Sequence, residues 1–332
     1  MYHVLIPEDI TPPGKDYLLE RGYKLKVGVS TDIATLRREI ADADALLVRI
    51  ARYPREVLEA GTKLKVVARH GAGVDNVAVD YAESQGIWVV NAPQANGNTV
   101  AEFVTAMVMA LECDILGLDR HTRIGDWNYR MGLRRRELAG RTAGILGFGR
   151  IGRLTAEKLI RGLGINVMAY HPRRPSGMAG EVRLTQDLGE LLGSSDYVIV
   201  LVPSTAETRN MFNYQVFSMM KRGAYYINCA RGDTYVEADL VKALEEGLIA
   251  GAAIDVFTPE PKPESPLFSM DQVIVSQHCA GLSKEAADRM SLHAAMGIDE
   301  VLRGDIPVWA ANHPANPRMP QRNPSGKDPG CG

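Results

Sequence analysis

The stretch Arg141-Thr142-Ala143-Gly144-Ile145-Leu146-Gly147-Phe148-Gly149-Arg150-Ile151-Gly152 decides the fold, because an apolar strand pattern runs directly into a G-x-G-x-x-G turn and a helix pattern follows. Gly147 permits a tight turn, Gly149 lets the backbone approach a pyrophosphate, and Gly152 lets helix and strand pack closely. A pyrophosphate in this turn would meet unpaired N–H groups at the helix N-terminus. The stretch therefore predicts dinucleotide binding, with a purely structural glycine-rich turn as the alternative.

The next strand ends in Ala169-Tyr170-His171-Pro172-Arg173-Arg174, about 20 residues beyond the turn, where an acidic side chain would bind the adenosine ribose. No carboxylate is present there, and His171 takes its place. Guanidinium groups bind a 2′-phosphate well, whereas a carboxylate would repel it. The sequence therefore favours NADP(H) over NAD(H). The alternative is that Arg173 and Arg174 form a solvated loop and that NAD(H) binds without an acidic clamp.

Two series of alternating strand and helix patterns flank the turn. The first predicts strands at Val4–Ile6, Leu25–Val27, Ala45–Val48, Val66–Ala68 and Ile87–Val90, with helical stretches at Thr35–Ile40 and Pro54–Ala60. The second predicts strands at Ala143–Leu146, Val167–Tyr170, Tyr197–Val202, Ala224–Asn228, Ala252–Val256 and Val273–Val275. One long helix is expected from Thr99 to about Leu118, and a last one over Lys284–Leu302. Such alternation indicates α/β domains with parallel sheets.

The domain organisation expected from this order is discontinuous. We expect a substrate-binding domain from residues 1–98 together with 292–332, and a dinucleotide-binding domain from residues 99–291. Both domains would be Rossmann-like or flavodoxin-like, with the active site in the cleft between them. The end of the chain, His313–Gly332, is rich in Pro, Gly and Asn and is expected to be a mobile or surface-hugging tail.

Composition and charge narrow the class of protein. The 332 residues carry a formal net charge of −2, which gives no overall attraction to nucleic acid or to an anionic membrane. No apolar run approaches the roughly 18 residues of a spanning helix. The four cysteines lie far apart, which favours a reducing cytoplasm, and no cysteine or histidine cluster has metal-ligand spacing. We expect no metal, nucleic-acid or membrane partner.

Three predicted strand ends carry polar side chains. Arg231 follows the strand that ends at Asn228, Asp255 and Glu260 follow the next strand, and His278 follows the last. Because ligands gather at the carboxyl ends of strands in open α/β sheets, these side chains could converge on one site.

This combination suits the reduction of a 2-oxo acid. Hydride addition at a carbonyl carbon builds negative charge on the oxygen, and a positioned acid must neutralise it. A histidine is suited to that step, a carboxylate such as Glu260 would orient the ring and favour its charged form, and Arg231 would hold the substrate carboxylate. Taken singly, a His or Glu after a strand is more often a capping or surface residue.

The segments Gly147–Gly152, Asn228–Gly232, Asp255–Pro261 and His278–Gly281, in this order and spacing, resemble the D-isomer-specific 2-hydroxyacid dehydrogenase family over about residues 45 to 305. The resemblance implies a catalytic triad of Arg231, Glu260 and His278. It also implies a homodimer built largely on the cofactor domains. The cofactor contacts that we expect are Thr99, Gly147, Gly149, Arg150, Ile151, Gly152, His171, Arg173, Arg174, Val202, Pro203, Thr208, Cys229, Ala230, Asp255 and Gly281.

The family's substrate loop resembles Arg69-His70-Gly71-Ala72-Gly73-Val74-Asp75-Asn76, where backbone N–H groups at Gly71–Gly73 would receive a carboxylate. The resemblance implies substrate contacts from Arg49, His70, Gly71, Ala72 and Gly73, besides Arg231 and His278. This sequence departs from the family at Gln277, where a proline is common, and at Ile50 and Arg52, which replace a small, polar loop. These departures leave the identity of the substrate open.

The function expected from these features is NAD(P)H-dependent reduction of a small 2-oxo acid to the (D/R)-2-hydroxy acid, with His278 as the proton donor. A dinucleotide-sensing interaction protein, like the family's transcriptional corepressors, is the alternative from another class, because such relatives resemble the enzymes at the triad. A third possibility is a Rossmann oxidoreductase acting on an alcohol or an amino acid.

Overall fold

The computed structural model describes residues 1–133 and 135–318 and divides the chain into two compact units. Of the described residues, the first unit contains 1–96 and 282–318, and the second contains those from 97 to 281. The sequence placed the second boundary at 291/292, which lies inside a helix that is continuous in the structure and belongs to the first unit as a whole. Among the described residues, no helix is both long enough and apolar enough to cross a bilayer.

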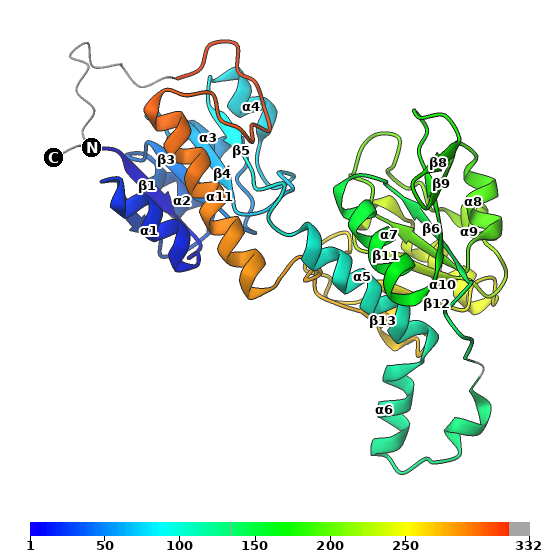
Figure 1. Cartoon of the computed structure of the whole chain (residues 1–332). Helices are drawn as coiled ribbons and strands as arrows, with labels where there is room; N and C mark the ends of the chain where they lie inside the picture. The colour runs from blue at the N-terminus through cyan, green and yellow to red at the C-terminus, as the bar shows by residue number, and fades with distance from the viewer. Residues whose placement is uncertain (134, 319–332) are drawn as a thin grey trace. The chain divides into compact units, whose positions relative to one another are not determined.

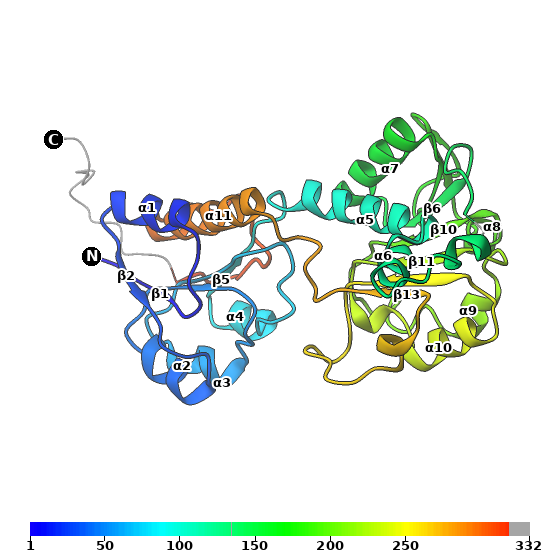
Figure 2. The same cartoon turned by 90° about the horizontal axis from the view of Figure 1, so that it is seen from below.

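The first unit is a five-stranded, parallel sheet in the order β2-β1-β3-β4-β5. Its strands are β1 (His3–Ile6), β2 (Lys24–Val27), β3 (Ala45–Val48), β4 (Val66–Arg69) and β5 (Trp88–Val90). Helices α1 (Pro12–Glu20) and α11 (Lys284–Arg303) pack together on one face, and α2 (Ile33–Ile40), α3 (Arg55–Ala60) and α4 (Val79–Ser84) cover the other (Figures 1 and 2). Strands β3, β4 and β5 are buried on both faces, which explains their continuous apolar runs, whereas the edge strand β2 is mostly exposed.

The end of the described chain lies against this unit. The backbone N–H of Arg318 donates to the Gly86 carbonyl at 2.7 Å, and its guanidinium donates to the carbonyls of Gly61, Thr62 and Leu64. The described part of the expected tail, residues 313–318, is therefore held at the surface of the unit. The rest of that segment, residues 319–332, lies outside the described residues.

The second unit is an eight-stranded sheet in the order β13-β12-β11-β10-β6-β7-β9-β8, parallel except for the β8–β9 pair. Its strands are β6 (Thr142–Leu146), β7 (Asn166–Tyr170), β8 (Gly177–Ala179), β9 (Val182–Thr185), β10 (Tyr197–Val200), β11 (Tyr225–Asn228), β12 (Gly251–Ile254) and β13 (Val273–Val275). The sequence predicted β6, β7 and β10–β13 with small differences at their ends. It missed the β8–β9 hairpin, which forms the edge of the sheet.

Helices cover both faces of the second sheet. The core on one face includes apolar residues of α5 (Gly97–Glu112) and α7 (Arg150–Leu163), and the core on the other includes α8 (Leu188–Ser194), α9 (Tyr214–Ser218) and α10 (Glu237–Glu245). Short 3₁₀ turns are η1 (Tyr129–Gly132), η2 (Gly232–Thr234) and η3 (Pro266–Ser269). Helices α7, α9 and α10 each connect two strands that are parallel neighbours, as expected for crossover connections.

The long helix predicted from Thr99 to Leu118 is wrong in one respect, because the structure divides it into α5 and α6 (Ile115–Arg123). Asp114 lies between them with a φ of 49°, in the left-handed region, so the helix cannot continue through it. Helix α6 and η1 project from the sheet of this unit (Figure 1). We call the described residues from Cys113 to Leu133 the arm.

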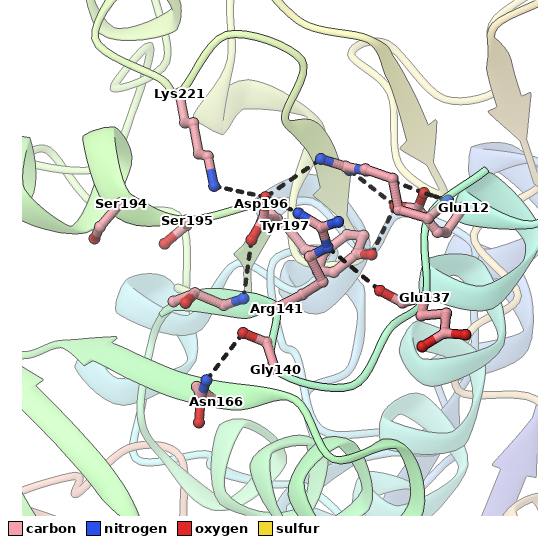
Figure 3. A network of polar contacts seen from close by, with 12 residues as sticks. Glu112, Glu137, Gly140, Arg141, Asn166, Ser194, Ser195, Asp196, Tyr197 and Lys221 are labelled. Carbon is pink, nitrogen blue, oxygen red and sulfur yellow. Dashed lines mark hydrogen bonds and ion pairs between the residues drawn. The ribbon is translucent and has the colours of Figure 1, made fainter. Parts of the chain in front are cut away.

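A polar network closes the base of the arm (Figure 3). Glu112 and Asp196, each only 2 % exposed, are both bound by the Arg136 guanidinium, at 2.8 Å and 3.3 Å. Glu112 also accepts the Tyr197 hydroxyl at 2.7 Å, and Asp196 accepts the Lys221 ammonium at 2.8 Å. Burial raises the pKa of each carboxyl group, but the hydrogen bonds and positive charges outweigh it, so that both pKa values lie below their ordinary range. Both carboxylates are therefore held ionised inside the unit.

Candidate active site

The glycine turn between β6 and α7 has a shape that fits a pyrophosphate. Gly147 has a φ of +100°, and a Cβ built on it would lie 2.6 Å from the Leu201 carbonyl carbon. A Cβ on Gly152 would lie 2.3 Å from the Gly147 oxygen, so both positions exclude a side chain. Gly149 is different, because a Cβ there would meet nothing within 4 Å. It precedes α7 with no side-chain cap and no acidic residue in the first turn, which leaves N–H groups for an anion.

The end of β7 carries the basic residues that the sequence singled out. Arg173 and Arg174 are exposed, and the Arg173 N–H donates to Nδ1 of His171 at 3.3 Å. The carboxyl group of Glu207, in the loop after β10, feels the Arg173 charge, which contributes to the lowering of its pKa after hydrogen bonding from Thr205. In that loop the Thr208 hydroxyl donates to the Pro203 carbonyl at 2.6 Å. Val202 and Thr99 were also expected at the cofactor; Val202 begins this loop and Thr99 lies in α5.

The segment that carries Arg231 is fixed from within the unit by Asn228, which is fully buried. The Asn228 amide oxygen accepts the Ala230 N–H at 3.0 Å, and its amide nitrogen donates to the Tyr226 hydroxyl, the Thr234 hydroxyl and the Arg231 carbonyl. The Arg231 guanidinium also donates to the Ala230 carbonyl at 2.7 Å. The side chain of Arg231 is therefore presented from a stiff segment at the carboxyl end of β11.

Cys229 lies between Asn228 and Ala230 and is partly buried. Burial raises the pKa of its thiol well above the ordinary value, with smaller contributions from Asp255 and Cys279. Its thiol is therefore uncharged, and Cys229 packs partly against the apolar core of the unit.

Glu260 and His278 form a direct pair. Nδ1 of His278 lies 2.7 Å from Oε2 of Glu260, while Oε1 of Glu260 accepts the Phe257 N–H at 2.7 Å. Burial raises the pKa of Glu260, but the hydrogen bonds from His278 and Phe257 and the charges of His278 and Arg231 outweigh it, and the pKa is lowered. The carboxylate is thus ionised and fixed through both oxygens. The ring of His278 remains about half exposed, with Nε2 as the second ring nitrogen.

Asp255, which is 1 % exposed, holds the segment around His278. Its carboxylate accepts the Ser276 hydroxyl at 2.6 Å, the Cys279 N–H at 2.9 Å and the Ala280 N–H at 3.0 Å. Its carbonyl accepts the His278 N–H at 2.7 Å. The cofactor contact that the resemblance implies for Asp255 stays a prediction, and both oxygens of this carboxylate also bind the protein. Gly281, expected at the cofactor, follows directly after this anchored segment.

The expected substrate loop in the first unit contains an open set of N–H groups. Within the described part of the chain, the backbone N–H groups of Ala72, Gly73 and Val74 donate to no protein acceptor. The expectation was wrong for Gly71, because its N–H donates to the Arg69 carbonyl at 2.8 Å. Gly71 adopts a φ of +148°, which favours glycine, and its carbonyl accepts the Ala92 N–H at 2.8 Å. Consecutive free N–H groups of this kind form a receptor for a carboxylate.

His70 and Arg49, which were also expected to contact the substrate, have different surroundings from the open N–H groups of that loop. His70 is 6 % exposed, and burial, with charge from Arg49 and Arg69, lowers its pKa to about 4. Its imidazole is therefore neutral and inside the unit, with Nε2 bound to none of the described residues. The Arg49 guanidinium donates to the Asp9 carbonyl at 2.7 Å.

Two residues that the sequence did not single out shape this part of the first unit. The Glu8 carboxylate accepts the backbone N–H groups of Arg49, Ile50 and Ala51 at 3.0–3.2 Å. The Asn76 amide donates to the Arg49 and Ala51 carbonyls at 3.0 Å and 2.8 Å. The role of Glu8 could have been inferred from the sequence, because Glu8 follows the end of a predicted strand. No sequence pattern indicated the role of Asn76.

The structure therefore brings Arg231, Glu260 and His278 to the carboxyl ends of β11, β12 and β13, which are neighbours in one sheet. Arg49 and the loop His70–Gly73 belong to the other unit and lie at the carboxyl ends of β3 and β4, where Asn76 joins them.

Comparisons with known proteins identify relatives of this chain. Residues 105–280 match the model of the "D-isomer specific 2-hydroxyacid dehydrogenase, NAD binding domain". The chain is 36% identical to D-3-phosphoglycerate dehydrogenase of Methanocaldococcus jannaschii over 91% of its own length, but it spans only 58% of that relative. It is 35% identical to glyoxylate reductase of Pyrococcus furiosus, over 83% of this chain and 84% of the relative.

A solved structure with a similar fold is the NADPH-dependent glyoxylate/hydroxypyruvate reductase of Sinorhizobium meliloti. It has a TM-score of 0.85 and 27% identity, and the match covers 96% of this chain and 100% of that one. The family model and the glyoxylate reductase together cover both units of the chain. On these grounds, the chain belongs to the D-isomer specific 2-hydroxyacid dehydrogenase family.

Proposed function

We propose that this protein reduces a small 2-oxo acid to the (R)-2-hydroxy acid with a nicotinamide dinucleotide as the reductant. The observation that carries the proposal is the 2.7 Å pair between His278 and Glu260 at a strand end next to that of Arg231. The dinucleotide would be held by Gly147, Gly149 and Gly152, and its nicotinamide, when bound, supplies the hydride.

The residues of the chain would then act on the carbonyl of the substrate. His278, with Nδ1 engaged by Glu260, would donate a proton from Nε2 to the carbonyl oxygen as negative charge builds there. The ionised Glu260 fixes the orientation of the ring through Nδ1. Arg231 would bind the substrate carboxylate and polarise the carbonyl through its planar donors.

The proposal for the cofactor is NADP(H). It is supported by the absence of a carboxylate at the end of β7 and by the exposed guanidinium groups of Arg173 and Arg174. Two guanidinium groups bind a phosphate more strongly than a ribose hydroxyl, because charge-assisted hydrogen bonds are the stronger ones.

We also propose that the protein is a homodimer through its second unit. The arm exposes large apolar side chains to solvent, an arrangement that marks protein interaction sites. They are Ile115, Leu116, Ile124, Trp127 and Met131, with exposures of 49–81 %.

The experiment that tests the function is a spectrophotometric assay of the purified chain. NADPH and NADH oxidation would be followed across glyoxylate, hydroxypyruvate, pyruvate and longer 2-oxo acids, with simple aldehydes and imino acids as controls. We expect turnover with at least one 2-oxo acid and none with the controls. Tight dinucleotide binding without turnover on any 2-oxo acid would contradict the proposal and favour a dinucleotide-sensing role.

A further inference from the structure

Asp233, two residues after Arg231, binds the loop that follows β10. Its Oδ2 accepts the Ser204 hydroxyl at 2.5 Å and Nε of Arg209 at 3.3 Å. Its backbone carbonyl accepts the Asn210 N–H at 2.8 Å. Both the side chain and the main chain of Asp233 are thus joined to one loop, residues 201–210, which we call the β10 loop.

The β10 loop begins against the glycine turn. The Leu201 N–H donates to the Leu146 carbonyl at 2.7 Å, at the last residue of β6. Gly147 packs so closely on Leu201 and Val202 that a Cβ would lie 2.6 Å and 2.9 Å from their backbone atoms. A shift of the glycine turn would therefore move the start of the β10 loop, because the two backbones are in direct contact, with no flexible side chain between them.

On its other side, the segment of Asp233 is fixed to the Arg231 and Glu260 segments. A Cβ on Gly232 would lie 2.1 Å from the Phe257 carbonyl carbon, and the Phe257 N–H is the group that binds Glu260. The Thr234 hydroxyl donates to the Arg231 carbonyl at 2.7 Å. The side chain of Asp233 therefore connects the β10 loop to the segment that carries Arg231.

The hydrogen-bond donors around the Asp233 carboxylate favour the position that it has in the structure. Its Oδ1 is buried and accepts no hydrogen bond from the described residues. A buried carboxylate oxygen without a donor is unfavourable, so the charge depends on the two donors at Oδ2. Removing the Ser204 hydroxyl would leave only Arg209, at the longer distance.

We propose that Asp233 is a positioning residue that couples dinucleotide binding at the glycine turn to the orientation of Arg231, through its hydrogen bond with Ser204. The inference rests on the proposed function, because it assumes that Arg231 binds the substrate carboxylate. Binding of the dinucleotide against the β10 loop would hold Ser204 and Asp233 in place, and Arg231 would then meet the substrate in a fixed geometry. Asp233 itself touches no substrate.

The test is the thermodynamic coupling between the dinucleotide and oxamate, a non-reducible analogue of a 2-oxo acid. Calorimetric titration of the full chain gives the oxamate dissociation constant with and without saturating NADPH, and the ratio is the coupling factor. We expect a factor of about 10 or more for the wild type, within the usual range for coupled sites. In Asp233→Ala and in Ser204→Ala it should fall to within about threefold of one. The double variant should lose no more than either single variant, because both remove the same link.

Asp239→Ala is the matched control, since Asp239 is another carboxylate of this unit and accepts the Tyr214 N–H at 3.0 Å, between α9 and α10. Its coupling factor should equal that of the wild type. An unchanged factor in Asp233→Ala and Ser204→Ala, or a wild-type factor of one, overturns the inference. If Asp233→Ala does not fold, Ser204→Ala decides alone. A wild type that binds no oxamate with NADPH and reduces no 2-oxo acid would show instead that the proposed function has failed.

Discussion

His278 has a backbone φ of 51°, a region that residues other than glycine rarely adopt. Such a conformation costs on the order of 1–3 kcal/mol and persists only where the surroundings enforce it. Asp255 provides that enforcement by binding Ser276, Cys279 and Ala280 with its side chain and the His278 N–H with its carbonyl. The ring that meets Glu260 is therefore held by a buried carboxylate one strand away.

Some residues of the site could be predicted from the sequence, and others could not. Arg231, Glu260 and His278 could be placed together because each follows a strand of one parallel sheet. The roles of Asn76 and Asp233 could not be foreseen, because they depend on loops that meet only in the folded chain. The roles in catalysis and binding that the resemblance implies remain predictions.

The choice of cofactor can be tested on Arg173 and Arg174. Replacing both with alanine should raise KM for NADPH by roughly tenfold or more and change KM for NADH by about twofold at most, because charge-assisted hydrogen bonds are worth about 1.5–3 kcal/mol. Arg183→Ala on β9 is the matched control, since Arg183 is an exposed arginine of the same sheet that pairs with Glu190. An equal loss for both cofactors would show that these arginines do not bind the 2′-phosphate.

Among the elements, the glycine turn and the other strands were predictable, whereas the β8–β9 hairpin and the arm were not. Apolar spacing predicted one helix from Thr99 to about Leu118, and it gave no sign that the helix would end at Glu112 and that a new one would begin at Ile115. The break depends on Asp114, which is held by the Tyr129 hydroxyl at 2.6 Å. A contact between residues so far apart in sequence leaves no periodic signal.

The network at the base of the arm should make stability depend on pH. The folded-state pKa values of Glu112 and Asp196 are lowered, so their stabilising contribution is complete above the ordinary carboxyl range and is lost as the pH falls through the folded values. Urea unfolding followed by circular dichroism should show falling stability from about pH 5 to about pH 3. Glu112→Gln should lower stability at pH 7 by about 3–5 kcal/mol and reduce this slope, because Arg136 then loses one of its two buried carboxylate partners.

Glu157→Gln is the matched control, because Glu157 pairs with Arg161 on the surface of α7 and should change stability by less than about 1 kcal/mol. A Glu112→Gln variant with the stability and the pH slope of the wild type would contradict the role assigned to the network.

For the molecule as a whole, the sequence predicted two α/β units and a discontinuous first unit. The second boundary was placed too late, because α11 has one continuous apolar face and sequence patterns do not show to which sheet a helix docks.

The proposed homodimer is tested by sedimentation equilibrium of the wild-type chain and of Trp127→Glu. The wild type should be dimeric and the variant largely monomeric. A monomeric wild type would contradict the proposed homodimer.

The central claim is that His278 donates the proton in the reduction, and the most direct measurement compares His278→Ala with the wild type in turnover and in NADPH affinity. Loss of a general acid lowers the rate by about 10²–10⁴-fold. We therefore predict a kcat reduced by at least about 10²-fold and an NADPH dissociation constant within about threefold of the wild type. A variant that keeps its kcat, or one that loses NADPH binding instead, would contradict the claim.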